Sequence, residues 1–476
     1  MIRRFVVVAP ILLAAACAVN PATGKRELSL VSEGQEIQMG LQYDQQLVQE
    51  LGEYPDTALA KYVDGLGRQL AALSERPGLP WTFRVMDDPT VNAFAVPGGH
   101  VYITRGILAH MNSEAQLVSV LGHEIGHITA RHTVQQMTQQ TLFQAGLIAG
   151  VILKPELADY AGLAGAALQV LFLKFSRDDE AQADELGFRY MRRANYDPRE
   201  MAEMFAELSR VSAAAGARLP EWQSTHPDPV GRKEKTLERA ATLSAQELSD
   251  AIVRREEYLR RLDAVMYGPN PREGFFRESR FLHPDLQFEF TFPTGWKTVN
   301  EKTVVGAVGP NQEVVLMIGA GQGTSPADGA RTFFAQQGVS GSPSSTTVNG
   351  LPAAGGGFVA ETQNGVLQGR VLFLMHRDVL FRVMGYAAQA RWGPYQNIVG
   401  ASLQTFRPLT DATALAVQPW RIDIVRVDRT MTPTEFAQRY PGPISADELA
   451  LINQIDAGGR FMNRNLAKRV VGQAIR

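Results

Sequence analysis

The stretch of residues 113–130 reads SEAQLVSVLGHEIGHITA, and the rest of the chain is best interpreted from it. It opens with a serine that is followed three residues later by a glutamine, the pattern of a capping box at the start of a helix. Apolar residues then recur at helical spacing, which predicts one helix over residues 113–138. Within that helix His123 and His127 are four residues apart, so they share one face.

Two imidazoles on one helix face can bind the same metal ion, and zinc suits imidazole. A catalytic zinc has three protein ligands and an open position for water. Glu124 follows the first histidine, and in an HExxH motif this glutamate takes the proton of the attacking water. The motif therefore predicts one Zn²⁺ per chain, with His123 and His127 as ligands and Glu124 as catalytic base. His132 lies five residues past His127, so we expect it to point off the ligand face and to be either a residue that supports the ligands or a structural one.

The third ligand has to come from elsewhere in the chain. A metzincin would have glycine at position 130 and histidine at position 133, but this chain has Ala130 and Thr133, so that class is excluded. A glutamate from a later helix is the other common choice, and Glu180 and Asp184 are four residues apart. One carboxylate can bind the metal while the other accepts the second ring N–H of a ligand histidine. The alternative is a solvated acidic helix start.

These separated motifs resemble the M48 family of metallopeptidases. The segment SRDDEAQAD at residues 176–184 follows the HExxH motif as it does in that family, and the likeness covers residues 28–265. The periplasmic, BepA/LoiP-like branch matches best. The resemblance implies a mainly helical zincin-type (gluzincin) protease domain, with Glu180 as third zinc ligand. It also implies that Asp184 and Arg177 support the ligands.

Two further segments resemble parts of the family's active site. One is the edge strand where an extended peptide can pair with free backbone groups; an ordinary edge strand is the alternative. Its residues are Asn92, Ala93, Phe94, Ala95 and Val96. The other is the histidine loop THPDP at residues 225–229. The resemblance implies that His226 either caps the zinc at rest or stabilises the oxyanion, and Arg232 is a second candidate for the oxyanion. A plain surface loop is the alternative for His226.

The N-terminus has the pattern of an export signal. Two arginines precede an apolar run over residues 5–16, and Cys17, the only cysteine, follows directly. The run is too short to span a membrane. A cysteine here resembles the lipidation site of bacterial lipoproteins, although Ala14 stands where that signal usually has leucine. We expect residues 1–17 to be a signal peptide and Cys17 to carry a lipid that anchors the chain to the outer membrane in the periplasm. Simple cleavage to a soluble exported protein is the alternative.

At 476 residues the chain is longer than one hydrophobic core supports, so several domains are expected. Residues 18–32 are polar and irregular, which predicts a tether. Residues 33–266 should form the protease domain, with a small edge sheet. Residues 275–410 alternate between strand-like and helix-like patterns, which predicts a small α+β domain, and their start weakly resembles PsbP/Mog1 domains. Residues 415–473 resemble a degenerate LysM module that could contact cell-wall glycan. The expected class of the whole chain is α+β.

The formal net charge is −2 and no cationic block occurs, so a nucleic-acid partner is excluded. The resemblance implies peptide-bond hydrolysis in misfolded or stalled cell-envelope proteins, a periplasmic quality control, and contact with the outer-membrane assembly machinery. One rival is a periplasmic chaperone or scaffold with a latent metal site, against which the intact Glu124 argues. A membrane-embedded M48 protease is disfavoured because no segment is long enough to span. Residues 141–175 are unusually apolar: they predict either two buried helices or a surface that touches membrane or covers the active site.

Overall fold

The computed structural model of the chain describes residues 17–141, 174–215, 221–362 and 365–473. They form two compact units. The first consists of the chain up to Gly268 together with Arg421–Val471, and the second spans Pro269–Trp420. The predicted signal peptide before Cys17 and nearly all of the apolar segment 141–175 lie outside the described residues. Among those described, no helix combines the length and the apolar character that crossing a bilayer requires.

The segment predicted as an irregular tether instead contains a small hairpin. Strand β1 (Cys17–Val19) pairs antiparallel with β2 (Arg26–Leu28). Asn20 between them is buried, and its side chain donates a hydrogen bond of 3.1 Å to the carbonyl of Ala130. Strands of three residues are too short to show a periodicity in the sequence, which is why the prediction missed them.

Helices and a small sheet follow. The apolar residues that recur at helical spacing after Glu33 belong to two capped helices, and two strands flank the turn at residues 97–99. The elements are α2 (Glu33–Leu51), α3 (Thr57–Ala71), β3 (Thr82–Met86), β4 (Ala93–Val96) and β5 (His100–Thr104). The sheet order is β3-β5-β4, with β3 parallel and β4 antiparallel to β5. Strand β4 is therefore an edge strand, as predicted.

The helix predicted over residues 113–138 is shorter than expected. Helix α5 (Glu114–Thr129) starts after the N-cap Ser113 and ends at Ala130. Arg131 has a φ of 59°, a left-handed conformation that breaks the helix, and a second helical stretch begins at His132. The break changes the direction of every side chain after it.

Further helices of the first unit follow, and several of them contact α5. They are α4 (Arg105–His110), α8 (Arg177–Arg193), α9 (Arg199–Ala215), α10 (Glu221–Thr225), α11 (Pro229–Ala240), α12 (Ala245–Ser249) and α13 (Arg255–Arg261). A single apolar core joins α3, α5, α8 and α9 to the sheet. All sixteen residues of α5 are buried, so this helix is the centre of the unit.

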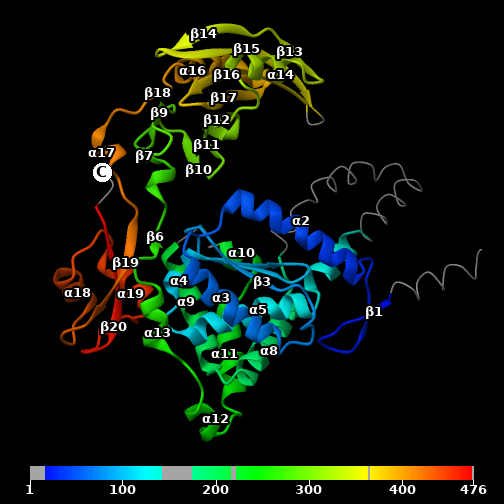
Figure 1. Cartoon of the computed structure of the whole chain (residues 1–476), viewed down its shortest axis with the longest axis vertical. Coiled ribbons are helices and arrows are strands. Elements are labelled where there is room, and N and C mark those ends of the chain that lie inside the picture. Colours follow the sequence, from blue (N-terminus) through cyan, green and yellow to red (C-terminus); the bar gives the residue numbers. More distant parts are fainter. Residues whose placement is uncertain (1–16, 142–173, 216–220, 363–364, 474–476) are drawn as a thin grey trace, which may run out of the picture. The chain divides into compact units, whose positions relative to one another are not determined.

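The last segment of the chain belongs to the first unit and not to a separate domain. Its elements are β19 (Trp420–Arg426), α18 (Pro433–Arg439), α19 (Ala446–Ile452) and β20 (Leu466–Val471). Strands β20, β19 and β6 (Met266–Tyr267) form one sheet in that order, and β20 packs on α13 (Figure 1). We call residues 421–471 the C-terminal module. The second unit is thus inserted, in sequence, between β6 and β19.

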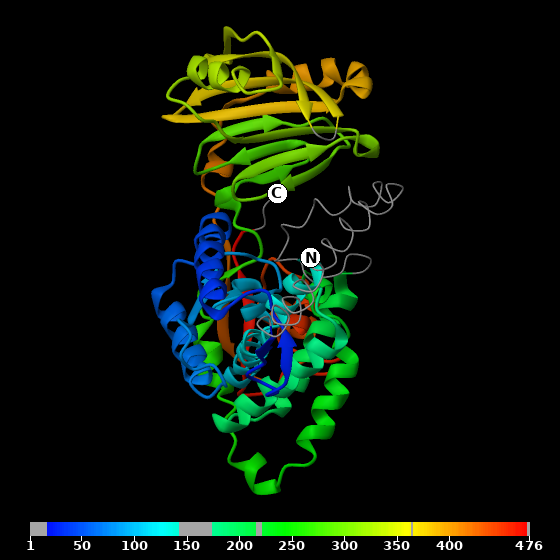
Figure 2. The ribbon, with the colours of Figure 1, turned by 90° about the vertical axis from the view of Figure 1, so that its right-hand side faces the viewer.

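The second unit is built mainly of antiparallel strands. One sheet has the order β10-β11-β12-β17-β16-β15-β13, with β14 also on β15, and another has the order β18-β9-β8-β7. Helix α14 packs on β15 and β16, and α16 packs on β16 and β17 (Figure 2). The mixed helix-and-sheet class expected for the chain is confirmed.

The second unit contains η4 (Pro271–Glu273), β7 (Phe275–Arg277), β8 (Arg280–His283), β9 (Phe288–Thr291), β10 (Lys297–Asn300), β11 (Val304–Val308), η5 (Pro310–Gln312), β12 (Val314–Ala320), α14 (Pro326–Phe334), β13 (Val339–Gly341), β14 (Ser344–Val348), β15 (Leu351–Thr362), β16 (Gly365–His376), β17 (Val379–Ala388), α15 (Gln389–Trp392), η6 (Gly393–Tyr395), α16 (Gln396–Leu403), β18 (Arg407–Pro408) and α17 (Ala412–Leu415). The sequence did not predict β15, because its three consecutive glycines are unusual in a strand. At Gly355 a Cβ would lie only 2.1 Å from the carbonyl oxygen of Val371, so close strand packing requires glycine there.

Candidate metal centre

Small residues let α8 approach α5 closely. At Gly126, inside the HExxH motif, a Cβ would lie 2.9 Å from the carbonyl oxygen of Ala183 on α8. One turn earlier, a Cβ at Gly122 would lie 3.2 Å from the Cα of Gly187. A larger side chain at either glycine would push the helices apart. This contact brings the carboxylates of α8 to the histidines of α5.

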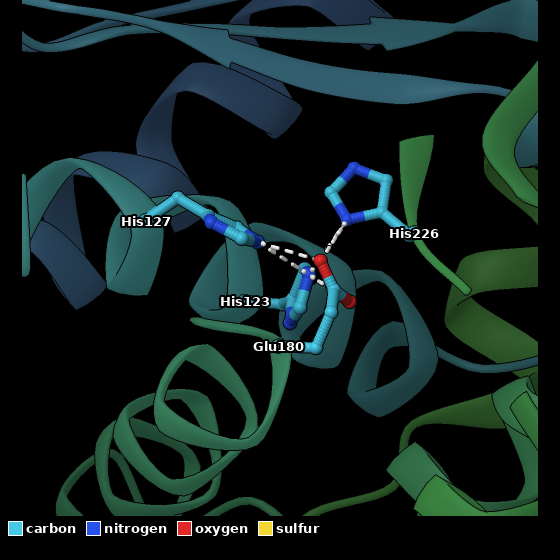
Figure 3. A group of neighbouring side chains, drawn as sticks. All are labelled: His123, His127, Glu180 and His226. Atoms are coloured by element: carbon cyan, nitrogen blue, oxygen red, sulfur yellow. Dashed lines mark hydrogen bonds and ion pairs between the residues drawn. The ribbon is translucent and has the colours of Figure 1, made fainter. Parts of the chain in front are cut away.

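Four side chains converge at this contact: His123, His127, Glu180 and His226 (Figure 3). The Nε2 atoms of the two α5 histidines are 3.0 Å apart. Glu180 places Oε2 3.6 Å from Nε2 of His123 and Oε1 3.4 Å from Nε2 of His127. Ligand atoms around a tetrahedral zinc are about 3.3 Å from one another, given metal–ligand distances near 2 Å. The two imidazoles and the carboxylate therefore fit one metal ion.

The first histidine is held in the form that binds metal. Nδ1 of His123 lies 3.0 Å from Oδ1 of Asp184, so the proton on Nδ1 is donated to this carboxylate and Nε2 carries a free lone pair. Burial, and then the neighbouring Arg232, lower the pKa of His123 to about 3. The imidazole is therefore neutral at pH 7, as a ligand must be.

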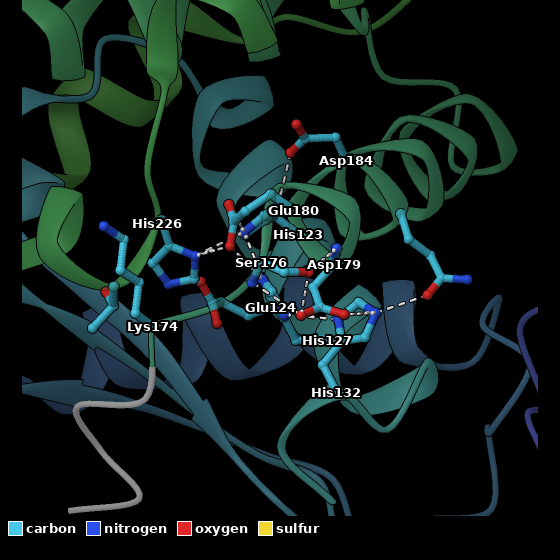
Figure 4. A network of polar contacts seen from close by, with 12 residues as sticks. His123, Glu124, His127, His132, Lys174, Ser176, Asp179, Glu180, Asp184 and His226 are labelled. Carbon is cyan, nitrogen blue, oxygen red and sulfur yellow. Dashed lines mark hydrogen bonds and ion pairs between the residues drawn. The ribbon is translucent and has the colours of Figure 1, made fainter. Parts of the chain in front are cut away.

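The second histidine is held in the same form by a chain of contacts that the sequence did not predict (Figure 4). Nδ1 of His127 lies 2.9 Å from Nδ1 of His132, and Nε2 of His132 lies 2.7 Å from Oε1 of Gln182. Because His132 donates through Nε2 to the amide oxygen, its Nδ1 accepts the proton of His127. Burial lowers the pKa of His132 to about 4, which keeps it neutral. His132 was expected to point off the ligand face; the break at Arg131 instead turns it toward His127, where it supports a ligand histidine, one of the two roles expected for it.

Arg232 holds the two carboxylates of α8 that lie at the site, Glu180 and Asp184. Its Nη1 lies 2.6 Å from Oε2 of Glu180, while Nε and Nη2 donate to the two oxygens of Asp184 at 2.8 and 2.7 Å. Burial by itself would raise the pKa of Asp184, but Arg232 and His123 outweigh it and lower the pKa to about 2. The same guanidinium, against the effect of burial, lowers the pKa of Glu180 well below its usual value. Both carboxylates are therefore ionised.

Glu124 is buried beside this group, and burial raises its pKa to about 7. Nε2 of His226 lies 3.9 Å from Oε1 of the glutamate. A carboxyl group whose pKa lies near neutral pH can both accept and return a proton. The chemistry expected from the motif is thus compatible with the environment of Glu124.

His226 occupies the fourth corner of the group. Its Nδ1 lies 2.9 Å from Oε1 of Glu180 and 3.3 Å from Nε2 of His123. Two aromatic rings hold the imidazole: Trp222 stacks on it at 5.1 Å, and Phe175 lies 5.5 Å away. The backbone N–H of Phe175 also donates to the carbonyl of Thr225. His226 is therefore a buried member of the site and not a plain surface loop residue.

The other predicted site residues lie as follows. Strand β4 packs against α5, with Phe94 and Ala95 partly exposed along the sheet edge. Asn92 precedes it and is buried. Arg177 is exposed at the first position of α8, so it is not among the buried groups that hold the ligands. Cys17 lies in β1.

Sequence reasoning missed two residues that shape the site, namely Phe175 and Trp222 beside His226. No spacing rule points to aromatic residues that contact a loop histidine. For His132 it left open whether the side chain supports a ligand or is structural, because the direction of the ring depends on where the helix ends.

Comparisons with known proteins agree with this geometry. Residues 57–240 match peptidase family M48. The beta-barrel assembly-enhancing protease of Escherichia coli (strain K12) is 32% identical over 229 residues, which are 46% of this chain and 47% of that protein. The mitochondrial metalloendopeptidase OMA1 of Schizosaccharomyces pombe is 31% identical over 225 residues, 46% of this chain and 65% of that protein. The chain thus spans about half the length of the first relative.

Among solved structures, cyanobacterial PsbP (CyanoP) from Synechocystis sp. PCC 6803 is similar at 14% identity and a TM-score of 0.23, over 28% of this chain and 94% of that one. So low a score supports no conclusion about residues 275–410. The family match, by contrast, includes the HExxH helix and the helix with Glu180. Residues 57–240, which include the metal centre, therefore resemble peptidase family M48.

Proposed function

We propose that the chain is a zinc-dependent endopeptidase that hydrolyses peptide bonds of misfolded or stalled cell-envelope proteins. One observation carries the proposal: His123 and His127 both direct an unprotonated Nε2 at the ionised Glu180, with Glu124 buried next to them. A bound zinc would polarise the scissile carbonyl and lower the pKa of a water molecule toward neutrality.

The chain's own residues supply the remaining steps. An extended substrate pairs with the backbone of the edge strand β4, which gives affinity with little sequence preference. Glu124 takes a proton from the attacking water and delivers it to the leaving amine. Arg232 is already engaged by Glu180 and Asp184, so we assign it to holding the ligands and not to the oxyanion.

His226 gives the site a resting state. Its Nδ1 fills the corner where water has to enter, so the imidazole must withdraw before hydrolysis begins. The displaced ring would remain near the reacting carbonyl, where it could donate to the oxyanion. The same observation favours the rival function, a chaperone or scaffold with a latent metal site, if the imidazole never withdraws.

The test uses protein that starts at Ala18. We expect one zinc per chain and cleavage of an unfolded protein such as casein. Glu124→Gln should retain zinc and lose activity by on the order of 10³-fold, because proton transfer is removed. Glu185→Gln is the matched control: it is the same exchange at an exposed position of α8 and should cleave like wild type. Equal cleavage by wild type and Glu124→Gln, or no bound zinc, would refute the proposal.

His226→Ala separates the two roles of the histidine. If the variant cleaves severalfold faster than wild type, His226 is a cap. If it cleaves more slowly than wild type, His226 is an oxyanion donor. If neither the variant nor wild type cleaves any unfolded protein while both bind zinc, the latent-site function is favoured.

The location in the cell is also proposed. The export pattern and Cys17 support a lipoprotein at the outer membrane, in the periplasm, where the named activity of the Escherichia coli relative suggests contact with the outer-membrane assembly machinery. Cys17→Ala should move the protein from the membrane fraction to the soluble periplasmic fraction. An unchanged membrane fraction would exclude lipidation as the anchor.

A further inference from the structure

Lys468, on strand β20 of the C-terminal module, is completely buried although it carries an amine. Its Nζ donates hydrogen bonds to the carbonyls of Ala109 and Met111, at 2.6 and 2.8 Å. These carbonyls lie at the C-terminal end of α4, where the last carbonyls of a helix lack partners within it. Burial lowers the pKa of Lys468 well below its usual value, and a neutral amine still has the two N–H groups that these carbonyls need.

The same module also holds the residues that follow. Asn112, in the short link between α4 and α5, donates from Nδ2 to the carbonyl of Ile452 at 3.2 Å. Gln454 donates to the carbonyl of His110 at 2.9 Å, and its amide pairs reciprocally with that of Gln116 at 3.0 Å. The groups that the module contacts in this region belong to residues 109–116, so each of them lies within four residues of Ser113, the N-cap of α5. The start of the HExxH helix is therefore fixed by the C-terminal module.

A second contact reaches α9. Arg210 pairs with Asp456 of the module at 2.6 Å and with the buried Glu207 at 3.0 Å. Glu207 in turn lies 2.8 Å from Nδ1 of His110, at the end of α4. Helix α9 also supplies Met201 and other apolar side chains that line a small pocket beside His123. The module thus contacts α5, which carries His123, and α9, which lines the pocket beside it.

A shift at the start of α5 would reach the metal ligands. His123 lies ten residues from Ser113, which is about 15 Å along a continuous α-helix. Because the whole of α5 is buried, its neighbours leave no room for a local bend to absorb such a shift. A displacement of well under 1 Å is enough to spoil a metal site.

We propose that the C-terminal module is a positioning element of the metalloprotease site, and that Lys468 is its central positioning residue. The inference rests on the proposed function, and it assigns the module a role within the catalytic unit and not the glycan contact expected from the sequence. The site is then incomplete without residues 452–468, although none of them reaches the metal ligands.

The test compares Lys468→Met with Arg469→Met in the full chain from Ala18. Methionine keeps the buried stem but removes both hydrogen bonds. Arg469, next on the same strand, pairs with Asp423 at a partly exposed position, so it is a matched control. We measure the zinc dissociation constant by competition with a chelator, kcat per zinc-loaded molecule, and amide hydrogen exchange in residues 110–118.

In Lys468→Met we expect zinc binding about tenfold weaker, kcat lower by a similar factor, and faster exchange in residues 110–118, because two buried carbonyls lose their partner. The control should match wild type in all three. A merely structural lysine would lower the melting temperature but leave kcat per zinc-loaded molecule unchanged. A folded Lys468→Met with wild-type zinc affinity, kcat and exchange would overturn the proposal.

If Lys468→Met does not fold, Gln454→Ala decides the question, with an expected loss of about threefold in zinc affinity and kcat. Wild-type values in that variant would equally overturn the inference. If wild type binds no zinc, the proposed function fails by itself. Exchange in residues 110–118 of the two variants then still decides whether the module positions α5.

Discussion

The two units of this chain are stabilised in different ways. The interior of the first unit contains many charged or titratable side chains, among them Arg76, Glu36 and the metal-centre residues. The described interior of the second unit is dominated by aromatic rings, such as Phe288 and Phe406, which stack at 4.9 Å. Buried charges are stable only when each has its partner, whereas apolar packing has no such condition. The first unit should therefore respond far more sharply to the loss of one partner.

The largest effect on stability is expected from a buried charge. Arg76 is 4% exposed and binds both oxygens of Glu36, at 2.8 and 3.0 Å, as well as the carbonyl of Ile128. Arg76→Met leaves this buried glutamate only Arg131 as a charged partner and should destabilise the first unit by about 3 kcal/mol. Arg68→Met is the control. The Arg68 side chain is 55% exposed in its ion pair with Asp64, so its loss should lower the free energy of unfolding by only about 0.4 kcal/mol. Urea unfolding measures both, and equal losses would show that burial of charge does not distinguish the first unit.

Removal of the metal should be next in size. At a free zinc concentration one hundred times the dissociation constant, binding stabilises the fold by about 2.7 kcal/mol. A chelator should therefore speed amide exchange in α5 and α8 and leave β16 and β17 of the second unit unchanged. Hydrogen exchange followed by mass spectrometry reports both regions in one sample. If the chelator speeds amide exchange equally in the two units, the conclusion that they are stabilised separately is contradicted.

The smallest effect is expected from a packing change in the second unit. Val399 on α16 is fully buried, and Val399→Ala should cost about 2 kcal/mol through lost apolar contact and a small cavity. The loss should appear in exchange of β16 and β17. Zinc affinity should stay at the wild-type value, and a weaker affinity would show that the units are coupled.

Local patterns predicted the metal site well. Helix α5, its N-cap and the shared face of the two histidines follow from periodicity and capping alone, and Glu180 came from the family's motif. The end of the same helix was not predictable, because Arg131 adopts a left-handed conformation that arginine rarely takes and that leaves no mark in the sequence. The position of His132 depends on that one residue.

The long-range arrangement was beyond the sequence. Lys468 and Ala109 are 359 residues apart, and no local pattern shows that a lysine on a short strand will be buried against a distant helix end. The stretch Trp420–Arg426 reads as a strand from its own residues, but nothing in it indicates that it pairs beside β6. Periodicity identifies elements, and only their tertiary contacts assign them to a unit.

The insertion of the second unit between β6 and β19 has a consequence for biosynthesis. A ribosome makes the HExxH helix early, but strand β20, with the lysine that holds the preceding helix end, comes only after some 340 further residues. If the C-terminal module positions the metal site as proposed, the site is not fully positioned while the chain is still being made. The proposed peptidase activity would then reach its full level only when synthesis is nearly finished.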